Sequence, residues 1–175
     1  MLKHRNRLML LLTICIAGST CARPKSAGAV FSPGGTMISY QSYVSERSFV
    51  NFLIGIEYGA LLLEQTSKPG INAGAGYNFI FRQRNNRSGT SVWYAGPAVS
   101  LGYMADKDKF HGMIFCFSGV IGYEYSFHLP VSLSVDLAPT LGLSFHNVDE
   151  NLQLSPYING FIWSLVPRIG IKYRF

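Results

Sequence analysis

Residues 131–146 read VSLSVDLAPTLGLSFH, and their alternating pattern is the strongest indication of the fold. Its odd-numbered positions hold apolar residues or proline throughout, whereas its even-numbered positions hold small or polar residues. Because successive side chains of a strand point to opposite faces, this alternation predicts a β-strand with one apolar face. Residues 112–127, GMIFCFSGVIGYEYSF, alternate in the same way, with most of the large apolar side chains on the odd-numbered positions.

The length of these alternating stretches distinguishes a membrane-spanning β-barrel from a soluble β-protein. Strands of globular proteins are usually about 5–6 residues long, whereas a strand that crosses a bilayer needs about 9–11 residues. Both stretches exceed the longer value. Their polar faces are rich in glycine and serine, which suits the narrow interior of a small barrel in lipid, because a soluble barrel would turn its apolar face inward. The sequence therefore predicts an all-β, antiparallel up-and-down transmembrane β-barrel whose apolar faces meet lipid.

Other parts of the chain supply the remaining strands. Alternation continues in five more stretches, residues 36–45, 49–60, 71–82, 91–104 and about 160–175. The first of these is ambiguous as to which face is apolar. Together with 112–127 and 131–146 they make seven strands. A closed up-and-down barrel needs an even number, so the short and weakly patterned stretch 24–32 is the candidate for an eighth strand.

Three prolines fall on outward positions inside these predicted strands, namely Pro97, Pro139 and Pro167. A proline cannot donate a ladder hydrogen bond, and a closed barrel has no edge strand on which to place it. We therefore expect bulges or missing ladder bonds at all three positions.

The connections between the strands fall into two sets of different length. Short or polar turns lie near 46–48, 83–90 and 128–130, whereas longer segments lie at 61–70, 105–111 and 147–159. The two sets alternate along the chain, apart from a short first connection at 32–35. Outer-membrane barrels have short periplasmic turns and longer outside loops, so we expect the short turns on the periplasmic side.

The first 22 residues have the features of a cleavable secretory signal peptide. Their positive n-region contains Lys3, Arg5 and Arg7. The apolar segment Leu8–Ala17 that follows is too short for a stable transmembrane helix. We expect cleavage after Ala22, and a second small-residue site ends at Ala29. A short membrane anchor or lipidation at Cys21 is the alternative, although Thr20 departs from the residue expected before a lipidated cysteine.

The composition argues against an ordinary soluble domain, a nucleic-acid-binding protein and a disulfide-stabilised domain. Of the 175 residues, 48% are hydrophobic and only 14% are charged, whereas soluble domains carry about 25% charged residues. Removal of residues 1–22 leaves 12 basic and 9 acidic residues, a net charge of +3, which gives no argument for nucleic-acid binding. Cys116 is then the remaining cysteine, so no internal disulfide is expected. Residues 23–175 form one predicted barrel domain.

The C-terminal segment carries a resemblance to a known family. Residues 169–175 read IGIKYRF, an alternating apolar pattern with a terminal phenylalanine. With the signal peptide and the long amphipathic strands, this resembles the small eight-stranded outer-membrane β-barrels of Gram-negative bacteria, of OmpA/OmpX-like architecture. The stretches 122–127 and 130–136 are similar to a family of such barrels frequent in Bacteroidota. The resemblance implies location in the outer membrane and an assembly signal, read by the barrel-assembly machinery, at Ile169, Ile171, Tyr173 and Phe175.

A set of inward-facing charges is the candidate functional site. Its members are Glu57, Glu124, Asp136, Arg168 and Lys172, with Arg82 and Arg174 as further inward charges. A hairpin turn at 128–130 would bring Glu124 near Asp136 on the next strand. Because an unpaired charge inside the barrel is costly, we expect opposite charges to pair. Two interpretations stay open, a salt-bridged plug that closes the lumen and a narrow or gated pore.

A catalytic interpretation is weaker. Ser144 and His146 share a predicted face near Glu150, which resembles the serine and histidine of outer-membrane lipid A deacylases. Those enzymes have the order His-x-Ser on the lipid face, whereas here the order is reversed and the face is inward. The histidines show no metal-ligand spacing, and Cys116 beside Ser118 is a small interior filler. We therefore expect no catalytic residue, cofactor or metal.

These observations predict a non-enzymatic, monomeric protein integral to the outer membrane, with a structural or surface-binding role. Its expected partners are outer-membrane lipid, lipopolysaccharide and the barrel-assembly machinery, and not nucleic acid. An eight-stranded barrel is just filled by its own side chains, which excludes a wide pore. Binding would therefore fall to the outside loops, chiefly 61–70 and 147–159. A narrow channel is the alternative function, and a lipid-modifying enzyme is the third.

Overall fold

The computed structural model describes residues 23–57, 70–105, 111–148, 151–156 and 165–175. The predicted signal peptide, with Cys21 and the site after Ala22, lies outside the described residues. So does most of the predicted outside loops 61–70 and 105–111. The third, 147–159, is largely described, and the expectation of a loop there is wrong in part, because Asn151–Pro156 form a strand that pairs with the end of the preceding one. The part of the chain that is described contains no helix long and apolar enough to cross a membrane.

The described residues form ten strands, and every pairing between them is antiparallel. In chain order the strands are β1 (Lys25–Ser32), β2 (Gly35–Ser45), β3 (Ser48–Glu57), β4 (Gly70–Asn86), β5 (Gly89–Ala105), β6 (His111–Phe127), β7 (Val131–Leu137), β8 (Thr140–Val148), β9 (Asn151–Pro156) and β10 (Arg168–Arg174).

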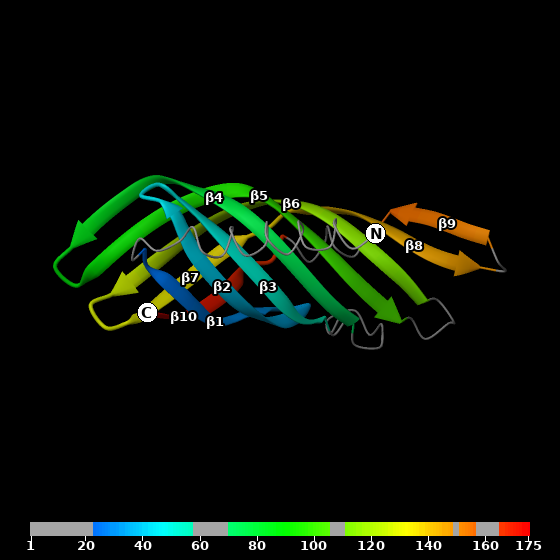
Figure 1. Cartoon of the computed structure of the whole chain (residues 1–175), viewed down its shortest axis with the longest axis horizontal. Helices are drawn as coiled ribbons and strands as arrows, with labels where there is room; N and C mark the ends of the chain where they lie inside the picture. The colour runs from blue at the N-terminus through cyan, green and yellow to red at the C-terminus, as the bar shows by residue number, and fades with distance from the viewer. Residues whose placement is uncertain (1–22, 58–69, 106–110, 149–150, 157–164) are drawn as a thin grey trace, which may run out of the picture.

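Eight of these strands close into a barrel, which confirms the predicted fold (Figure 1). β1 to β7 pair in sequence order, β10 pairs with both β7 and β1, and the pairing of β5 with β6 completes the ring. β8 continues the line of β7 along β6, and β9 pairs with β8 beyond the ring. The weakly patterned first strand exists, since all eight residues of β1 pair with β2.

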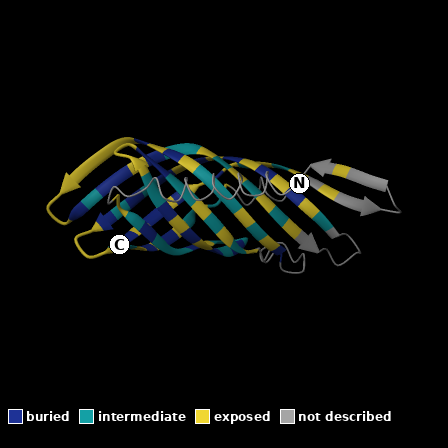
Figure 2. Cartoon of the chain, in the orientation of Figure 1, coloured by how far each residue is buried: buried dark blue, intermediate teal, exposed yellow. Residues whose placement is uncertain are grey.

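The barrel is apolar outside and polar inside. Outward residues such as Ile38 and Leu141 are 71% and 68% exposed, whereas inward Ser132 and Lys172 are 0% and 3% exposed. Figure 2 shows the resulting alternation of buried and exposed residues along the strands. The ambiguous second strand turns Ile38 and Tyr40 outward and encloses Ser39 and Gln41. This distribution is that of a transmembrane β-barrel, because a soluble barrel would bury its apolar face.

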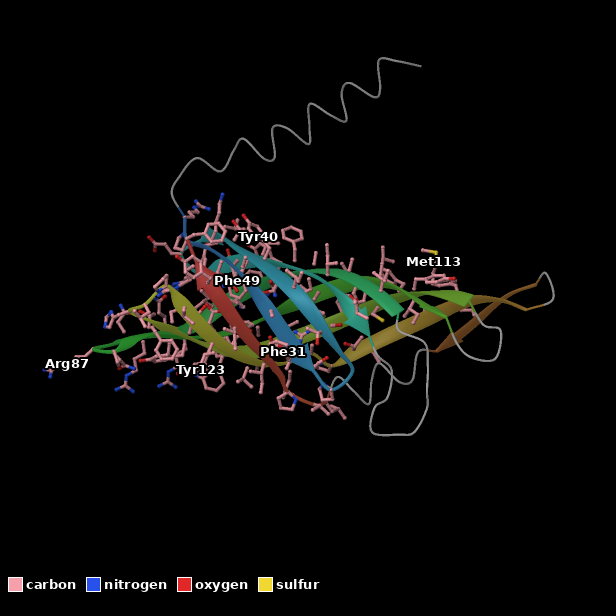
Figure 3. The ribbon with its side chains drawn as sticks, turned by 90° about the horizontal axis from the view of Figure 1, so that it is seen from below. Phe31, Tyr40, Phe49, Arg87, Met113 and Tyr123 are labelled. Atoms are coloured by element: carbon pink, nitrogen blue, oxygen red, sulfur yellow. The ribbon has the colours of Figure 1, made fainter. Side chains whose placement is uncertain are left out.

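An apolar cluster fills part of the interior. It consists of Phe49, Ile80, Val92, Tyr94, Val120 and Ala138, with Tyr43 and Ala98 packed against it. The rings of Phe49 and Tyr94 meet edge to face with centroids 5.1 Å apart. Phe49 is 1% exposed, whereas Phe31 and Met113, which Figure 3 also labels, are 48% and 59% exposed. The interior is therefore layered, with this aromatic cluster beside the polar groups described below.

The three prolines disturb the ladders in three different ways. β4 and β5 keep their register on both sides of Pro97, but the pairs opposite Pro97 and Gly96 are missing. Pro139 separates β7 from β8, and its carbonyl accepts a hydrogen bond from the amide of Gly119. Pro167 lies just before β10 begins at Arg168. The expectation of disturbed bonds is confirmed at Pro97 and Pro139, whereas Pro167 avoids the ladder by preceding the strand.

Both described ends of the chain meet at the end of the barrel that carries the β2–β3, β4–β5 and β6–β7 turns (Figure 1), which we call the turn end. There the amide of Lys25 donates to the carbonyl of Phe175 at 3.2 Å, and the amide of Phe175 donates to the carbonyl of Lys25 at 2.9 Å. The opposite end of the barrel is called the loop end.

Candidate functional site: the charge pairs of the lumen

The two cations of the interior ion pairs both come from the last strand, β10. β10 has period-2 geometry, so Arg168, Gly170 and Lys172 face the lumen while Ile169, Ile171 and Tyr173 face outward. Its neighbours β7 and β1 present only small inward side chains beside Lys172, namely Ser132 and Gly28. The long cationic side chains of β10 therefore have room to reach strands that are not their neighbours.

Lys172 uses this room in two directions. Its Nζ donates to Oε2 of Glu124 on β6 at 2.7 Å and to Oε1 of Gln41 on β2 at 2.6 Å. The Lys172 and Glu124 side chains are 3% and 2% exposed, so the ion pair is fully enclosed. One ammonium group thus ties together strands on both sides of β10.

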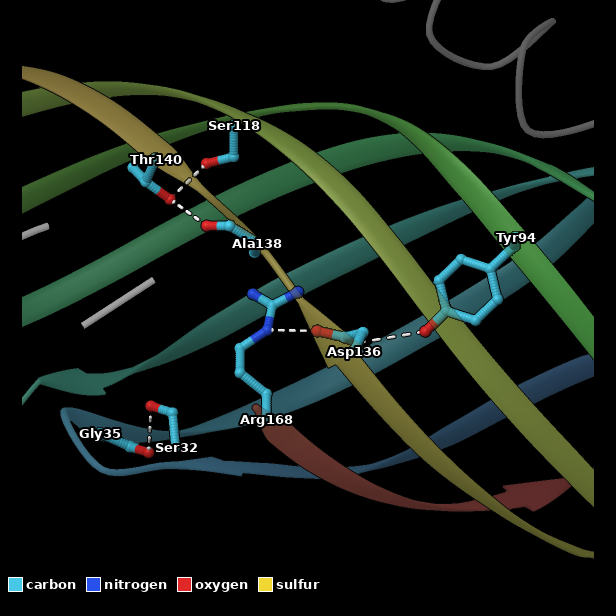
Figure 4. A network of polar contacts seen from close by, with 8 residues as sticks. All are labelled: Ser32, Gly35, Tyr94, Ser118, Asp136, Ala138, Thr140 and Arg168. Atoms are coloured by element: carbon cyan, nitrogen blue, oxygen red, sulfur yellow. Dashed lines mark hydrogen bonds and ion pairs between the residues drawn. The ribbon is translucent and has the colours of Figure 1, made fainter. Parts of the chain in front are cut away.

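Arg168 forms the second pair. Its Nε donates to Oδ1 of Asp136 on the neighbouring β7 at 2.5 Å, and the hydroxyl of Tyr94 on β5 donates to Oδ2 of the same carboxylate at 3.1 Å (Figure 4). Asp136 is therefore held from two sides of the barrel. Together the two networks connect β2, β5, β6, β7 and β10 through the lumen.

A glycine makes room for the Tyr94 contact. Gly122 on β6 pairs with Tyr94 on one side and with Asp136 on the other. A Cβ at Gly122 would lie 2.5 Å from the Tyr94 ring and 2.7 Å from Cβ of Asp136. The tyrosine ring crosses its neighbouring strand over this glycine, as aromatic side chains do when they cover a strand glycine.

The four side chains of these ion pairs are between 2% and 16% exposed. Taking an ion into such an interior costs several kcal/mol, and the cost is offset only when the geometry is good and the remaining polar atoms are bonded. Each carboxylate here meets one cation, and the four charges balance. Such an arrangement links strands and fills space in the lumen.

Several interior polar atoms have no protein partner among the described residues. They are Ser39 Oγ, Gln41 Nε2, Asn51 Oδ1, Asn78 Oδ1 and Ser132 Oγ. Gln41 pairs with Asn51 across β2 and β3, and Ser132 pairs with Lys172, so several of them lie close to the Lys172 network. Buried polar atoms of this kind are positions at which ordered water binds.

The other predicted inward charges have different positions. The side chain of Glu57 lies outside the described residues. Arg82 is exposed, and its predicted inward position is wrong, because an irregularity between Ile80 and Arg82 shifts the register of β4 against β5. Arg174 lies at the rim, where its guanidinium donates to the carbonyls of Phe127 and Leu129.

Sequence reasoning missed two members of the networks, Gln41 and Tyr94. Gln41 stood on the strand whose faces were ambiguous. The sequence did carry a signal for Tyr94, which is a large residue with a polar tip followed on its face by the small side chains of Gly96, Ala98, Ser100 and Gly102. Such a residue inside a barrel needs a hydrogen-bond partner.

The other sequence-predicted residues lie elsewhere in the chain. The side chains of Ser144 and His146, as well as Glu150, lie outside the described residues. Cys116 is buried in the interior. Within the described ranges, no group of three or more His, Cys, Asp and Glu residues is placed to hold a metal. The predicted assembly-signal residues Ile169, Ile171, Tyr173 and Phe175 are all exposed on the outer surface.

The closed ring, the apolar exterior and the charge-paired lumen define the class, an eight-stranded transmembrane β-barrel protein. No family model matches the chain, and no curated protein sequence does. Among solved structures, the chain is similar to a major outer membrane protein from Thermus thermophilus, at 16% identity and a TM-score of 0.45 over 88% of this chain and 100% of that chain. The class follows from the strand register and the burial pattern.

Proposed function

We propose that the protein is a non-enzymatic, integral outer-membrane barrel whose lumen is closed by its own side chains. The observation that carries this proposal is the enclosed Lys172–Glu124 pair with Gln41, which connects β10 to strands on both of its sides. The aromatic cluster around Phe49 fills the interior further. A lumen filled in this way leaves the surfaces of the barrel to interact with other molecules, in a structural or surface-binding role.

The proposal includes a location and an orientation. The barrel is exported with a cleavable signal peptide, assembles through its C-terminal strand, and stands as a monomer in outer-membrane lipid and lipopolysaccharide, without nucleic acid. Its turn end is periplasmic, because outer-membrane barrels have short turns on that side. The segments that join strands at the loop end, including the predicted loops 61–70 and 147–159, would then face outward and carry any binding function.

A narrow channel is the second candidate function. The interior polar atoms without a protein partner, chiefly on Ser39, Gln41, Asn51 and Ser132, favour it. They would support a line of water through the lumen if the charge pairs separated.

Conductance distinguishes the two functions. We expect the wild-type barrel in planar bilayers to show no conductance steps, and the double variant Glu124→Ala/Lys172→Ala to show them, because the interior groups that close the lumen are removed. The outward substitution Leu133→Ala is the matched control and should stay silent. Steps in the wild type that change in size in the double variant would establish the channel and refute the closed barrel.

Enzymatic activity has a separate assay. We expect no release of fatty acid when lipopolysaccharide is incubated with the refolded barrel. Release that disappears in Ser144→Ala would refute the non-enzymatic proposal.

A further inference from the structure

A β-bulge near the turn end changes which way two arginines face. Up to Ile80, the even positions of β4 point into the barrel, and Ile80 pairs with the buried Tyr94. The register then shifts, so that Arg82 pairs with the outward Trp93. Phe81 and Arg82 are both exposed as a result, and Arg84, two residues further, lies on the same outward face as Arg82.

The surroundings of these two arginines are aromatic. Trp93 packs on Tyr123 with ring centroids 5.1 Å apart, and Tyr125 packs on Phe127 with centroids 4.9 Å apart. Ser91, which pairs with Arg84, also pairs with Tyr125. Aromatic side chains of this kind gather at the height of lipid headgroups. The bulge therefore places Arg82 and Arg84 outside the barrel, beside a belt of interfacial rings.

No carboxylate neutralises these arginines within the described residues. The two ion pairs found there belong to the lumen, and Glu46 is the acidic residue of the described turn end. The same end carries further exposed cations, including Arg47 and Arg87, and Arg87 lies at the tip of the β4–β5 hairpin (Figure 3). The described turn end is therefore strongly basic.

We propose that Arg82 and Arg84 bind the phosphate of an anionic phospholipid, such as phosphatidylglycerol, in the leaflet at the turn end. This inference rests on the proposed membrane location. Guanidinium groups are suited to phosphate oxygens, which they can bind in bidentate fashion. The acyl chains of the same lipid would lie along the exposed side chains of Phe79 and Trp93. A lipid is favoured over a soluble acidic protein because the bulge turns Arg82 toward the side of the barrel that carries Trp93.

The test uses Trp93 as a local probe. The sequence has two tryptophans, so Trp163→Phe leaves Trp93 as the only source of tryptophan fluorescence. The full barrel with this background is refolded into vesicles of phosphatidylcholine and phosphatidylglycerol, in which one lipid or the other carries brominated acyl chains. We expect brominated phosphatidylglycerol to quench several-fold more than its mole fraction predicts. The preference should weaken as salt is raised.

Two variants complete the experiment. Arg82→Gln/Arg84→Gln should abolish the preference for phosphatidylglycerol, whereas Arg87→Gln, at the hairpin tip, should retain it. All three substituted side chains are exposed, so the variants should fold, and the shift in gel mobility on heating verifies this. Equal quenching by both lipids in the unsubstituted background, or a preference that survives in the double variant, would overturn the proposal.

The same data separate failure of this inference from failure of the proposed location. If brominated lipid of either headgroup quenches Trp93 without preference, the barrel lies in the bilayer and only the lipid site is refuted. If neither lipid quenches Trp93 in a correctly folded barrel, the membrane location of the turn end is refuted as well.

Discussion

At the residue scale, small residues on one strand allow large side chains from the neighbouring strand to pass over it and reach partners further round the barrel. Lys172 reaches Glu124 and Gln41 past Ser132 and Gly28, and Tyr94 reaches Asp136 past Gly122. A Cβ at Gly28 would lie 1.9 Å from the carbonyl oxygen of Ile171, so this position also requires glycine. The charge pairs therefore depend on the glycines, because a small residue on one strand leaves space for a large side chain from a neighbouring strand.

Two glycines of β6 give a matched test of this arrangement. Gly122→Ala should destabilise the barrel by about 1–3 kcal/mol, because the added methyl group would overlap Tyr94 and Asp136. Gly119→Ala should have little effect, since a Cβ there meets no atom within 4 Å. Urea unfolding in lipid vesicles measures both variants. An equal loss of stability in both would contradict the interior packing described here.

The Lys172–Glu124 pair predicts strong non-additivity. Lys172→Met should reduce the free energy of unfolding by about 3–5 kcal/mol, because it leaves Glu124 buried without its cation. Adding Glu124→Gln to that variant should recover a large part of the loss. The measurement is a double-mutant cycle from unfolding curves. Losses that simply add would show that the two side chains do not interact.

At the element scale, the strands are regular where side chains alternate and irregular where a bulge or a proline intervenes. β6 pairs without a break along the whole length of β5, whereas its other neighbour is divided into β7 and β8 at Pro139. The bulge in β4 shifts one step of the alternation and exposes Arg82. Each irregularity changes what the surface presents, and the bulge changes the chemistry of the turn end most.

The last strand yields a prediction about assembly. Phe175→Ala should reduce the amount of folded barrel in the outer membrane of cells, because the proposed assembly signal loses its terminal aromatic group. Phe127→Ala removes another outward aromatic residue near the turn end and serves as the control. The fraction of protein with heat-modifiable gel mobility measures assembly. Normal assembly of the Phe175 variant would show that this residue is no part of the signal.

At the scale of the whole molecule, the barrel has an apolar outer surface and a polar interior, and its charged residues lie in the lumen and at the turn end. Its sides are apolar, its lumen holds balanced pairs, and its described turn end is basic. The apolar sides require lipid, because water would be in contact with a continuous band of leucine, isoleucine and phenylalanine. The turn end adds electrostatic attraction to an anionic surface.

The apolar belt predicts the cost of a charge on the outer surface. Leu133→Arg, on the outward face of β7, should reduce the free energy of unfolding in vesicles by up to about 2–4 kcal/mol, depending on its depth in the bilayer. Leu129→Arg, in the β6–β7 turn, should be tolerated, although Leu129 is also exposed. If both variants kept wild-type stability, the outer face of β7 would not be in contact with acyl chains.

Most of the strands, most of their apolar faces and the class of barrel could be predicted from the amino-acid sequence, because alternation is a local property and a strand has only two faces. The strand β9, which lies inside the predicted loop 147–159, could not. The sequence also indicated which charges of β10 face inward. The contact of Lys172 with Gln41, the contact of Tyr94 with Asp136 and the outward position of Arg82 could be seen only in the folded barrel. Those contacts depend on the order and stagger of strands far apart in the chain, and on a single extra residue in β4. An alternating pattern indicates neither the order of the strands nor the position of a bulge, and one inserted residue exchanges the two faces of the strand for all the residues that follow it.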